Sequence, residues 1–415
     1  MKEAIILAGG LGTRLRSVVS DLPKCMAPVA GRPFLFYVIN YFQSQGIEKF
    51  LFSVGYKQEA IVEYLKDRFP TLRYQLVIEN EPLGTGGAAR LALQHASGET
   101  VLLANGDTLF KADIARLYKE HRQYNAACTL ALKPLADIER YGVVEINDDY
   151  SVRDFKEKKY YKKGFINGGI YTIDRKQFLK QGFPLQFSFE KEYLERSVAA
   201  GNGSIFGSIQ DDYFIDIGIP ADFNRAQSEF HQPPLELAKI DSSWTLFLDR
   251  DGVINVDKPG SYIFNADEFQ FYADAPGSFP VFARKFGRII IVTNQRGVGK
   301  GLMSEEDLAG IHAKMKAGIK DAGVEIDAIY YSTAVNYDAF ERKPNPGMAV
   351  QAKKDFPGID FNKSIMVGNN ISDMLFGKNA GMYTVFVKTT GPGQDFPHPD
   401  TDLSFNSLAD FAKAL

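Results

Sequence analysis

The stretch that most narrows the fold of this 415-residue chain is Phe247-Leu248-Asp249-Arg250-Asp251-Gly252-Val253-Ile254. The apolar run Trp244–Leu248 predicts a short strand that ends at Asp249, and Gly252 permits a tight turn after it. Asp249 and Asp251 lie two residues apart, so both carboxylates can face one cavity. One can attack phosphorus while the other protonates the leaving oxygen and later activates water. On this stretch alone, an acidic turn after a strand stays open as a purely structural reading.

Three later motifs suit the same site. Ile291-Val292-Thr293-Asn294-Gln295 predicts a strand that ends in a hydroxyl and an amide, which suit phosphate oxygens. Arg342-Lys343-Pro344 supplies cations that would offset the charge of a phosphoaspartate, and Val367–Asp373 supplies a further acid. Together with the opening stretch, these motifs resemble the haloacid-dehalogenase (HAD) phosphatase superfamily over residues 244–415. The resemblance implies a HAD-like Rossmannoid fold and a Mg²⁺ ion, which would offset the repulsion between carboxylate and phosphate.

Within that superfamily, residues 249–255, 293–295 and 342–348 look most like the D-glycero-D-manno-heptose-1,7-bisphosphate 7-phosphatases. Histidinol-phosphate phosphatases share much of the pattern. The catalytic residues that the resemblance implies are Asp249, Asp251, Thr293 and Lys343. The implied sugar-phosphate ligands are Asn294 and Arg342, and the implied Mg²⁺ ligands are Asp249, Asp251, Asn369 and Asp373.

Two features depart from the pattern of that subgroup. Its members usually carry a Cys/His zinc loop where this chain has residues 331–341, which contain neither residue type, so no zinc is expected. Asn369 stands where the family has an acid, and its uncharged amide predicts weaker Mg²⁺ binding, with Asp373 available to compensate. Two readings stay open, an active phosphatase and a retained scaffold. The surviving nucleophile, acid, hydroxyl and lysine favour activity.

A second phosphate-handling motif lies near the start of the chain. The predicted strand Ala4–Leu7 runs into Ala8-Gly9-Gly10-Leu11-Gly12-Thr13-Arg14, whose glycines let backbone N–H groups approach phosphates closely. Arg14 adds a planar cation for a pyrophosphate, and Lys24 could hold a second phosphate. The spacing matches neither the dinucleotide fingerprint nor a P-loop, and an ordinary strand-to-helix turn would also explain the loop on its own.

Later motifs strengthen the nucleotide reading. Gly84-Thr85-Gly86-Gly87 enters a predicted helix and suits the enclosure of a base or ribose. Asp107 follows the predicted strand Thr100–Leu103, and ligands of open α/β sheets bind at such strand ends. Asp216 follows another short apolar run. Two carboxylates with Mg²⁺ would neutralise charge on an attacked α-phosphate and a leaving pyrophosphate, although either aspartate alone would more simply be a turn or helix cap.

Residues 1–230 together resemble the sugar-1-phosphate nucleotidyltransferase family. The resemblance implies a Rossmann-like domain with a GT-A-like mixed sheet, in which a sugar phosphate attacks the α-phosphorus of a nucleoside triphosphate. It assigns catalysis to Arg14 and Lys24, Mg²⁺ to Asp107 and Asp216, and nucleotide binding to Gly9, Gly10, Gly12, Thr13, Arg14, Gly84 and Thr85. It assigns the sugar side to Gly142, Glu157, Lys158 and Asn167. Cys25 replaces the proline that usually follows the lysine, which should change loop stiffness rather than chemistry.

The two resemblances interlock. Residues 15–24 and 81–87 look most like D-glycero-α-D-manno-heptose-1-phosphate guanylyltransferases, then mannose-1-phosphate guanylyltransferases. The phosphatase would convert heptose 1,7-bisphosphate to heptose 1-phosphate, which would then accept GMP from GTP to give GDP-D-glycero-α-D-manno-heptose. An alternative is a mannose-1-phosphate guanylyltransferase, or another NDP-sugar pyrophosphorylase, whose second domain acts on a different sugar phosphate or serves only in assembly.

Composition and patterning indicate two α/β domains. Short β-rich runs alternate with helix-like segments until Pro233-Pro234 interrupts them, so we predict domains at 1–230 and 244–415 with a linker at 231–243. The net charge of −3 is dispersed, which argues against a nucleic-acid partner. Two cysteines exclude a disulfide framework. The lack of an apolar run of about 18 residues predicts no membrane association and a cytoplasmic location. A homo-oligomer stays open.

Overall fold

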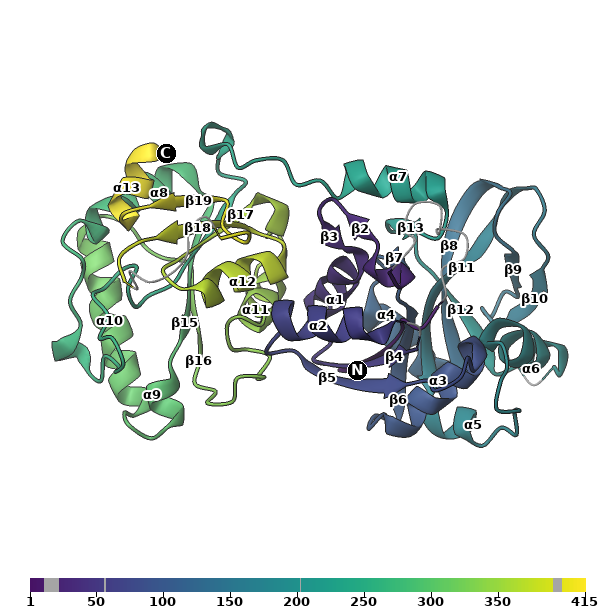
Figure 1. Cartoon of the computed structure of the whole chain (residues 1–415). Coiled ribbons are helices and arrows are strands. Elements are labelled where there is room, and N and C mark those ends of the chain that lie inside the picture. Colours follow the sequence, from purple (N-terminus) through teal and green to yellow (C-terminus); the bar gives the residue numbers. More distant parts are fainter. Residues whose placement is uncertain (11–21, 56, 202, 391–397) are drawn as a thin grey trace. The chain divides into compact units, whose positions relative to one another are not determined.

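The computed structural model describes residues 1–10, 22–55, 57–201, 203–390 and 398–415 (Figure 1). It divides into two compact units, Met1–Gln232 and Pro233–Leu415. Each unit has its own sheet, helices and core, which confirms the predicted α/β class and the presence of two domains with different topologies.

The first unit is built on a mixed sheet of nine strands among the described residues. The central order β5-β4-β1-β6 is parallel, and β11 then pairs with β6 in the antiparallel sense. Strands β8 to β11 pair antiparallel because hairpin connections replace helical crossovers there, which confirms the mixed sheet that the family resemblance implies. The strands are β1 Glu3–Leu7, β4 Lys49–Val54, β5 Arg73–Ile78, β6 Thr100–Asn105, β8 Cys128–Ile138, β9 Val143–Ile146, β10 Val152–Lys156, β11 Tyr161–Asp174 and β12 Ile205–Ile209.

Helices and two small ribbons complete this unit. The ribbons pair β2 Pro28–Val29 with β3 Arg32–Pro33, and β7 Thr108–Phe110 with β13 Phe214–Asp216. The helices are α1 Phe34–Ser44, α2 Gln58–Arg68, α3 Gly84–His95, α4 Ile114–Gln123, α5 Arg175–Leu179, α6 Arg196–Ala199 and α7 Pro220–Glu229, with a 3₁₀ turn η1 Lys24–Met26 and a π-helix η2 Phe189–Glu195.

Alternating side chains of β1 explain why this sheet is covered on both faces. Ala4 and Ile6 belong to one buried cluster, and Ile5 belongs to the other. A strand with consecutive apolar residues, such as positions 4–7 here, is expected where both faces of a parallel sheet are buried. The carboxyl edge of the parallel strands is therefore the part of the sheet that is available for polar side chains.

The second unit has a six-stranded sheet in the order β16-β15-β14-β17-β18-β19, and every strand pair is parallel. Its strands are β14 Thr245–Leu248, β15 Arg288–Asn294, β16 Ala328–Ser332, β17 Ser364–Gly368, β18 Tyr383–Val387 and β19 Leu403–Phe405. Its helices are α8 Ala275–Lys285, α9 Arg296–Gly299, α10 Glu305–Asp321, α11 Gly347–Asp355, α12 Ile371–Ala380 and α13 Leu408–Ala414, with 3₁₀ turns η3 Leu237–Lys239, η4 Ala266–Glu268 and η5 Phe361–Lys363.

The core of the second unit also lies on both faces of its sheet. Leu246 and Leu248 of β14 pack into one cluster, while Phe247 packs into the other. Leu235 and Ile240, from the segment predicted as a linker, are buried in the first of these clusters. Part of that segment thus packs on the second unit.

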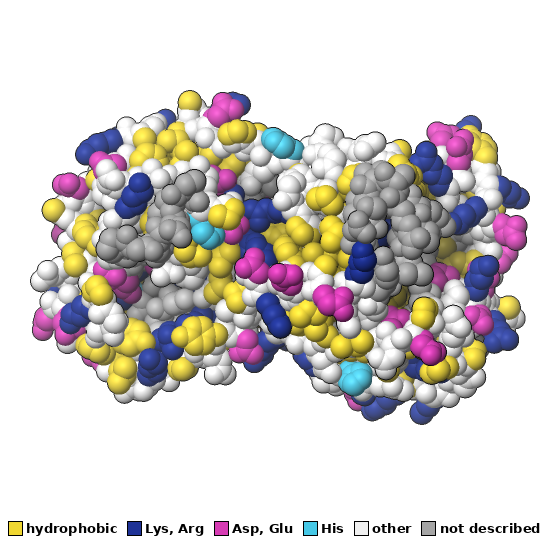
Figure 2. All heavy atoms as spheres, viewed as in Figure 1, with side chains coloured by type: hydrophobic (Ala, Val, Ile, Leu, Met, Phe, Trp, Pro, Cys, Tyr) yellow, Lys and Arg dark blue, Asp and Glu magenta, His cyan; other side chains and the backbone are white. Residues whose placement is uncertain are grey.

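On the face drawn in Figure 2, basic and acidic side chains are interspersed on both units, and neither kind forms a large patch of one charge. Among the helices of the described ranges, none combines the length and the apolar character needed to cross a membrane.

Two candidate active sites

The first candidate site is a cavity of about 590 Å³ at the carboxyl edge of the parallel strands of the first unit. Leu7 and Asn105 end β1 and β6, and Gly55 and Glu79 directly follow β4 and β5. Ligands of α/β sheets bind at this edge. The described lining residues are Leu7, Ala8, Gly9, Gly10, Lys24, Cys25, Gly55, Glu79, Asn80, Glu81, Pro82, Gly84, Thr85, Ala88, Asn105, Asp107 and Glu190.

The described part of the glycine loop lies in this cavity. A Cβ on Gly9 would lie 2.9 Å from Glu79 Oε1, so a larger residue there would require the Glu79 carboxylate to move. A Cβ on Gly10 would meet no atom within 4 Å, so protein packing does not explain that glycine, whereas the close approach of a ligand would. The other predicted ligands in the loop, Gly12, Thr13 and Arg14, lie outside the described residues.

Lys24, Asp107 and Asp216 come together although they are distant in sequence. The Lys24 ammonium is paired with Asp107 and lies 3.7 Å from Asp216 Oδ1. Burial raises the pKa of Asp216, and the Asp107 charge raises it further, while Lys24 counteracts both. Two neighbouring carboxylates beside this cavity fit Mg²⁺, which is typically held by one or two carboxylates and substrate phosphates. Asp107 and Asp216 would hold the ion here.

The glycine cluster at 84–87 has a packing role that the sequence did not indicate. The N–H groups of Gly86 and Gly87 donate to the Phe187 carbonyl at 3.0 and 3.4 Å. A Cβ on Gly86 would lie 2.3 Å from the Phe187 ring, and one on Gly84, whose φ is +70°, would lie 2.6 Å from the Phe187 oxygen. The glycines therefore allow residues 183–189 to dock on the N-terminus of α3, while Gly84 and Thr85 also face the cavity.

The predicted sugar-side residues are not among those that line this cavity. Glu157 and Lys158 are exposed after β10, and Gly142 packs closely on the Lys156 carbonyl, 2.7 Å from where its Cβ would be. Asn167 Nδ2 donates to the Tyr171 hydroxyl at 2.7 Å, and Asn167 Oδ1 accepts from Gly169 N at 3.1 Å. Asn167 thus supports the irregular part of β11, where the pairing with β8 shifts register.

Five polar residues that line the cavity were not singled out from sequence: Glu79, Asn80, Glu81, Asn105 and Glu190. The first three precede the glycine cluster, so their position after a strand could have suggested them. Asn105 ends β6, two residues before Asp107. Glu190 comes from η2, far along the chain, and no local pattern marks it.

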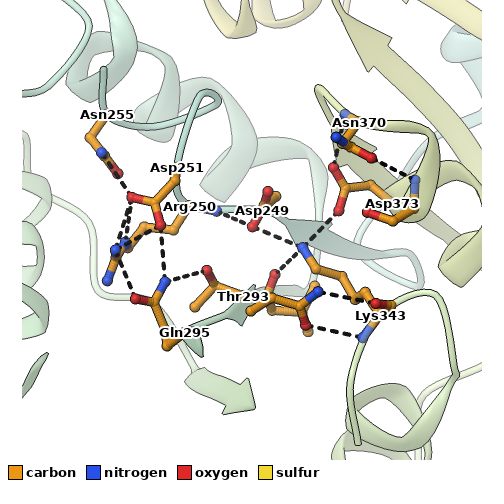
Figure 3. Close-up of polar contacts among 12 residues, drawn as sticks. Asp249, Arg250, Asp251, Asn255, Thr293, Gln295, Lys343, Asn370 and Asp373 are labelled. Carbon is orange, nitrogen blue, oxygen red and sulfur yellow. Dashed lines mark hydrogen bonds and ion pairs between the residues drawn. The ribbon is translucent and has the colours of Figure 1, made fainter. Parts of the chain in front are cut away.

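The second candidate site is a cavity of about 340 Å³ at the carboxyl edge of the second sheet (Figure 3). Its side chains follow β14, β15 and β17, the three neighbouring strands at the sheet centre. The described lining residues are Asp249, Asp251, Asp257, Pro259, Thr293, Asn294, Lys343, Asn369, Asn370, Ser372, Asp373 and Thr390.

A buried lysine organises the acidic side of this cavity. Lys343 Nζ lies 2.8 Å from Asp249 Oδ1 and 2.7 Å from Asp373 Oδ1, and it donates to the Val292 carbonyl at 2.9 Å. Burial raises the pKa of Asp249 to about 7, against the opposing effect of Lys343, and the Asp373 charge adds to the rise. A bound cation would favour the ionised form of Asp249, which is the nucleophilic form.

Asp251 sits in a separate hydrogen-bond network (Figure 3). The wholly buried Arg250 donates to it from Nε at 3.1 Å and from Nη2 at 2.7 and 2.8 Å. Gln295 Nε2 and Asn255 Nδ2 donate at 2.9 and 3.0 Å. Burial alone would raise the pKa of Asp251, but Arg250 and these amides outweigh it and the net pKa is lowered. The network orients the carboxylate and favours its basic form.

The remaining predicted phosphate ligands divide into two groups. Thr293 Oγ1 accepts from Gln295 Nε2 at 2.8 Å. The Thr293 hydroxyl hydrogen therefore points away from Gln295 and can be donated to a phosphate oxygen. Asn294 is engaged at both ends by the Lys343 backbone, at 3.0 and 3.1 Å. Arg342 donates to the Ala334 and Val335 carbonyls at 3.3 and 2.7 Å. Asn294 therefore positions Lys343, and Arg342 supports the segment that lacks the zinc ligands.

Asn369 follows β17 and faces the cavity. Its Nδ2 donates to the Thr390 hydroxyl, which leaves the amide oxygen as its acceptor atom. Asp249, Asp373 and this amide oxygen are donors that fit Mg²⁺, whereas the Asp251 carboxylate, also predicted as a ligand, is engaged by Arg250, Gln295 and Asn255. No group of three or more Asp, Glu, His or Cys side chains in the described ranges is close enough to form a metal site by itself. Substrate or water oxygens would therefore complete the coordination.

Comparison with known proteins supports both resemblances. Residues 3–232 match the family model described as nucleotidyl transferase, and residues 340–410 match one described as HAD-hydrolase-like. A D-glycero-α-D-manno-heptose 1-phosphate guanylyltransferase from Aneurinibacillus thermoaerophilus is 47% identical over 227 residues, covering 55% of this chain and 97% of its own. The enzyme of that name from Campylobacter jejuni is 42% identical over 221 residues, covering 53% and 96%. The solved structure of HddC from Yersinia pseudotuberculosis complexed with GMP-PN is 34% identical, with a TM-score of 0.51, and covers 55% of this chain and all of its own.

The packing of Phe187 on the glycine cluster predicts a stability effect. Gly86→Ala should lower the free energy of unfolding of the first unit by about 1–3 kcal/mol, because the new methyl group overlaps the buried Phe187 ring. Gly182→Ala is the matched control, since its Cβ would meet no atom within 4 Å, and it should change stability by less than about 0.5 kcal/mol. Urea unfolding of the full chain measures both, and equal stabilities would contradict the packing role.

Asn369 predicts a gain of metal affinity. Asn369→Asp should tighten Mg²⁺ binding at the second site by about tenfold, because a charged ligand replaces a neutral one. Asn370→Asp adds the same charge one residue later, where the side chain caps α12 by accepting from Ser372 N, and should have a smaller effect. Calorimetric titration with Mg²⁺ distinguishes them. Equal affinities for the two variants would remove Asn369 from the metal ligands.

Proposed function

The chain belongs to the nucleotidyl transferase family, and we propose that its first domain transfers GMP from GTP to D-glycero-α-D-manno-heptose 1-phosphate with release of pyrophosphate. The observation that carries this proposal is the identity of 47% over 227 residues to a guanylyltransferase of that specificity. The cavity supports it, because Lys24, Asp107 and Asp216 converge beside a space of about 590 Å³ at the strand ends.

The residues of the first cavity have different roles in the transfer of the nucleotidyl group. Lys24 lies beside Asp107 and would move its ammonium onto the phosphate oxygens as the triphosphate enters. Asp107 and Asp216 would hold Mg²⁺, which supplies positive charge to the attacked phosphate and to the leaving pyrophosphate. Gly9 and Gly10 allow the phosphates to approach the backbone. The main contribution of the protein is to position the acceptor oxygen and the α-phosphorus in line.

Two carboxylates of the first cavity favour guanine as the bound base. They belong to Glu79 and Glu81, which line the cavity beside Pro82 and Gly84. Guanine presents an N1–H and an amino group as donors on its pairing edge, which a carboxylate can accept together, whereas adenine presents an unprotonated N1 that a carboxylate would repel. Glu79 already accepts from Ser53 Oγ at 3.0 Å and Leu83 N at 3.3 Å, whereas Glu81 has no hydrogen-bond partner among the described residues, so Glu81 is the better-placed base ligand.

We propose that the second domain is a phosphatase that removes the 7-phosphate of D-glycero-D-manno-heptose 1,7-bisphosphate. Asp249 attacks phosphorus, and the bond to the sugar oxygen breaks as that oxygen takes a proton from Asp251, which must be protonated for this step against the lowered pKa that its network imposes. Asp251, now basic, then takes a proton from the water that hydrolyses the phosphoaspartate. Lys343 offsets the charge of the intermediate from 2.8 Å, and Thr293 donates its hydroxyl to a phosphate oxygen. Mg²⁺ held by Asp249, Asp373 and Asn369 would supply further charge neutralisation.

The two proposed reactions are consecutive. Loss of the 7-phosphate leaves a heptose 1-phosphate, which is the acceptor for the first domain, and the final product would be GDP-D-glycero-α-D-manno-heptose. The heptose 1-phosphate released by one site can reach the other by free diffusion, so the two reactions do not require channelling.

Reciprocal variants test the assignment of the two reactions. With Mg²⁺, GTP and heptose 1-phosphate, the wild-type chain should release pyrophosphate, and Lys24→Met should reduce that rate by about a hundredfold or more. With the 1,7-bisphosphate, the chain should release orthophosphate, and Asp249→Asn should abolish that release because an amide is not a nucleophile. Each variant should retain the other activity, so each serves as the folding control for its counterpart.

Three outcomes would contradict these proposals separately. Absence of pyrophosphate release with heptose 1-phosphate, together with turnover of mannose 1-phosphate, would reassign the acceptor. Equal absence of orthophosphate in wild type and Asp249→Asn would leave the second domain without catalysis. Simultaneous loss of both activities in either variant would point to unfolding rather than chemistry.

A further inference from the structure

We propose that Glu190 is a specificity residue that accepts hydrogen bonds from hydroxyl groups of the acceptor sugar in the first cavity. This inference rests on the proposed guanylyltransferase function and extends it to a residue on an element that carries none of the motifs of the site. Glu190 lines the cavity and lies on the π-helix η2, Phe189–Glu195. A π-helix is rare and is frequently found at functional sites.

The carboxylate of Glu190 is held in place from one side. Its Oε2 accepts from Thr85 Oγ1 at 2.8 Å and from Ser188 Oγ at 3.1 Å. Thr85 Oγ1 in turn accepts from Phe189 N at 2.9 Å, so the hydroxyl joins α3 to the start of η2. The docking of Phe187 on the glycine cluster fixes the same junction. The side chain is therefore preorganised, with Oε1 left without a protein donor among the described residues.

The charge of Glu190 needs an explanation in a cavity that receives phosphates. Asp107 is paired with Lys24, and Glu79 accepts from Ser53 and Leu83. Glu190 forms no ion pair with any lysine or arginine in the described ranges, and its only donors are two hydroxyls. An ionised carboxylate has acceptor capacity on both oxygens and no donor. The ligand group that satisfies Oε1 must be a donor without negative charge, and sugar hydroxyls meet that requirement.

The surroundings of Glu190 favour the acceptor sugar over the base. Phe189 packs on Tyr171 of β11 with ring centroids 4.8 Å apart, and the Tyr171 hydroxyl accepts from Asn167. Glu190 therefore follows a residue that packs on β11, the strand whose Asn167 the family resemblance assigns to the sugar side, although Asn167 itself does not line the cavity. The carboxylates assigned to the base, Glu79 and Glu81, follow a different strand, β5.

Steady-state kinetics of Glu190→Gln test the inference. The KM for heptose 1-phosphate should rise by about ten- to a hundredfold, because a hydrogen bond to a charged acceptor is lost, while the KM for GTP should change less than twofold. Glu195→Gln removes the same charge from the end of the same π-helix at an exposed position and should leave both constants unchanged. Thr85→Val should reproduce part of the effect by releasing Glu190, and Thr85→Ser should restore it.

Each other outcome overturns the inference in a recognisable way. A rise in the KM for GTP alone would place Glu190 on the nucleotide, and equal changes in both constants with a lowered melting temperature would give it a structural role. No change in either constant would remove it from the cavity's recognition groups. If the wild-type chain shows no pyrophosphate release with any sugar 1-phosphate, the guanylyltransferase proposal falls and this inference falls with it, whereas normal wild-type turnover with an unaffected Glu190→Gln defeats this inference alone.

Discussion

In each domain a lysine ammonium lies between two aspartate carboxylates at the carboxyl edge of a parallel sheet. Lys24 is shared by Asp107 and Asp216, and Lys343 is shared by Asp249 and Asp373. Carboxylates brought this close would repel each other without a cation, and burial increases the cost. The lysine makes the acidic cluster compatible with folding, and the cluster in turn is what suits both sites to metal and phosphate chemistry.

Much of both sites could be predicted because the relevant residues follow strands directly. Asp249 and Asp251 lie on one turn, and their positions at the cavity follow from the strand before them. The approach of Gly9 to Glu79 likewise joins two strand ends at one parallel edge, those of β1 and β5, which have β4 between them. Strand ends are visible in a sequence, and parallel pairing brings them to one edge. The antiparallel half of the first sheet was less predictable, because the alternation of strands and helices carries no information on hairpin connections.

Residues whose roles depend on distant partners could not be placed in advance. Asn294 carries an amide that would suit a phosphate oxygen, yet this amide is hydrogen-bonded to the Lys343 backbone 49 positions away. Glu190 reaches the first cavity only because Phe187 and Thr85 dock its helix on α3. The glycines at 84–87 had two compatible explanations, contact with a ligand and contact with protein, and only the position of Phe187 distinguishes them.

The burial of Arg250 constrains how the second domain can diverge. Its guanidinium has no exposed surface, and Asp251 is the only carboxylate in the described chain that pairs with it. Loss of the Asp251 carboxylate would leave the Arg250 charge buried without an ion-pair partner, which would cost about 3–5 kcal/mol of folding stability. Folding therefore requires Asp251 even if catalysis is dispensable. Replacement at position 369 carries no such penalty, because Thr390 satisfies the amide. This chain can therefore lose a charged metal ligand at position 369 without the folding cost that loss of Asp251 would carry, and the presence of Asp251 is not by itself evidence of turnover.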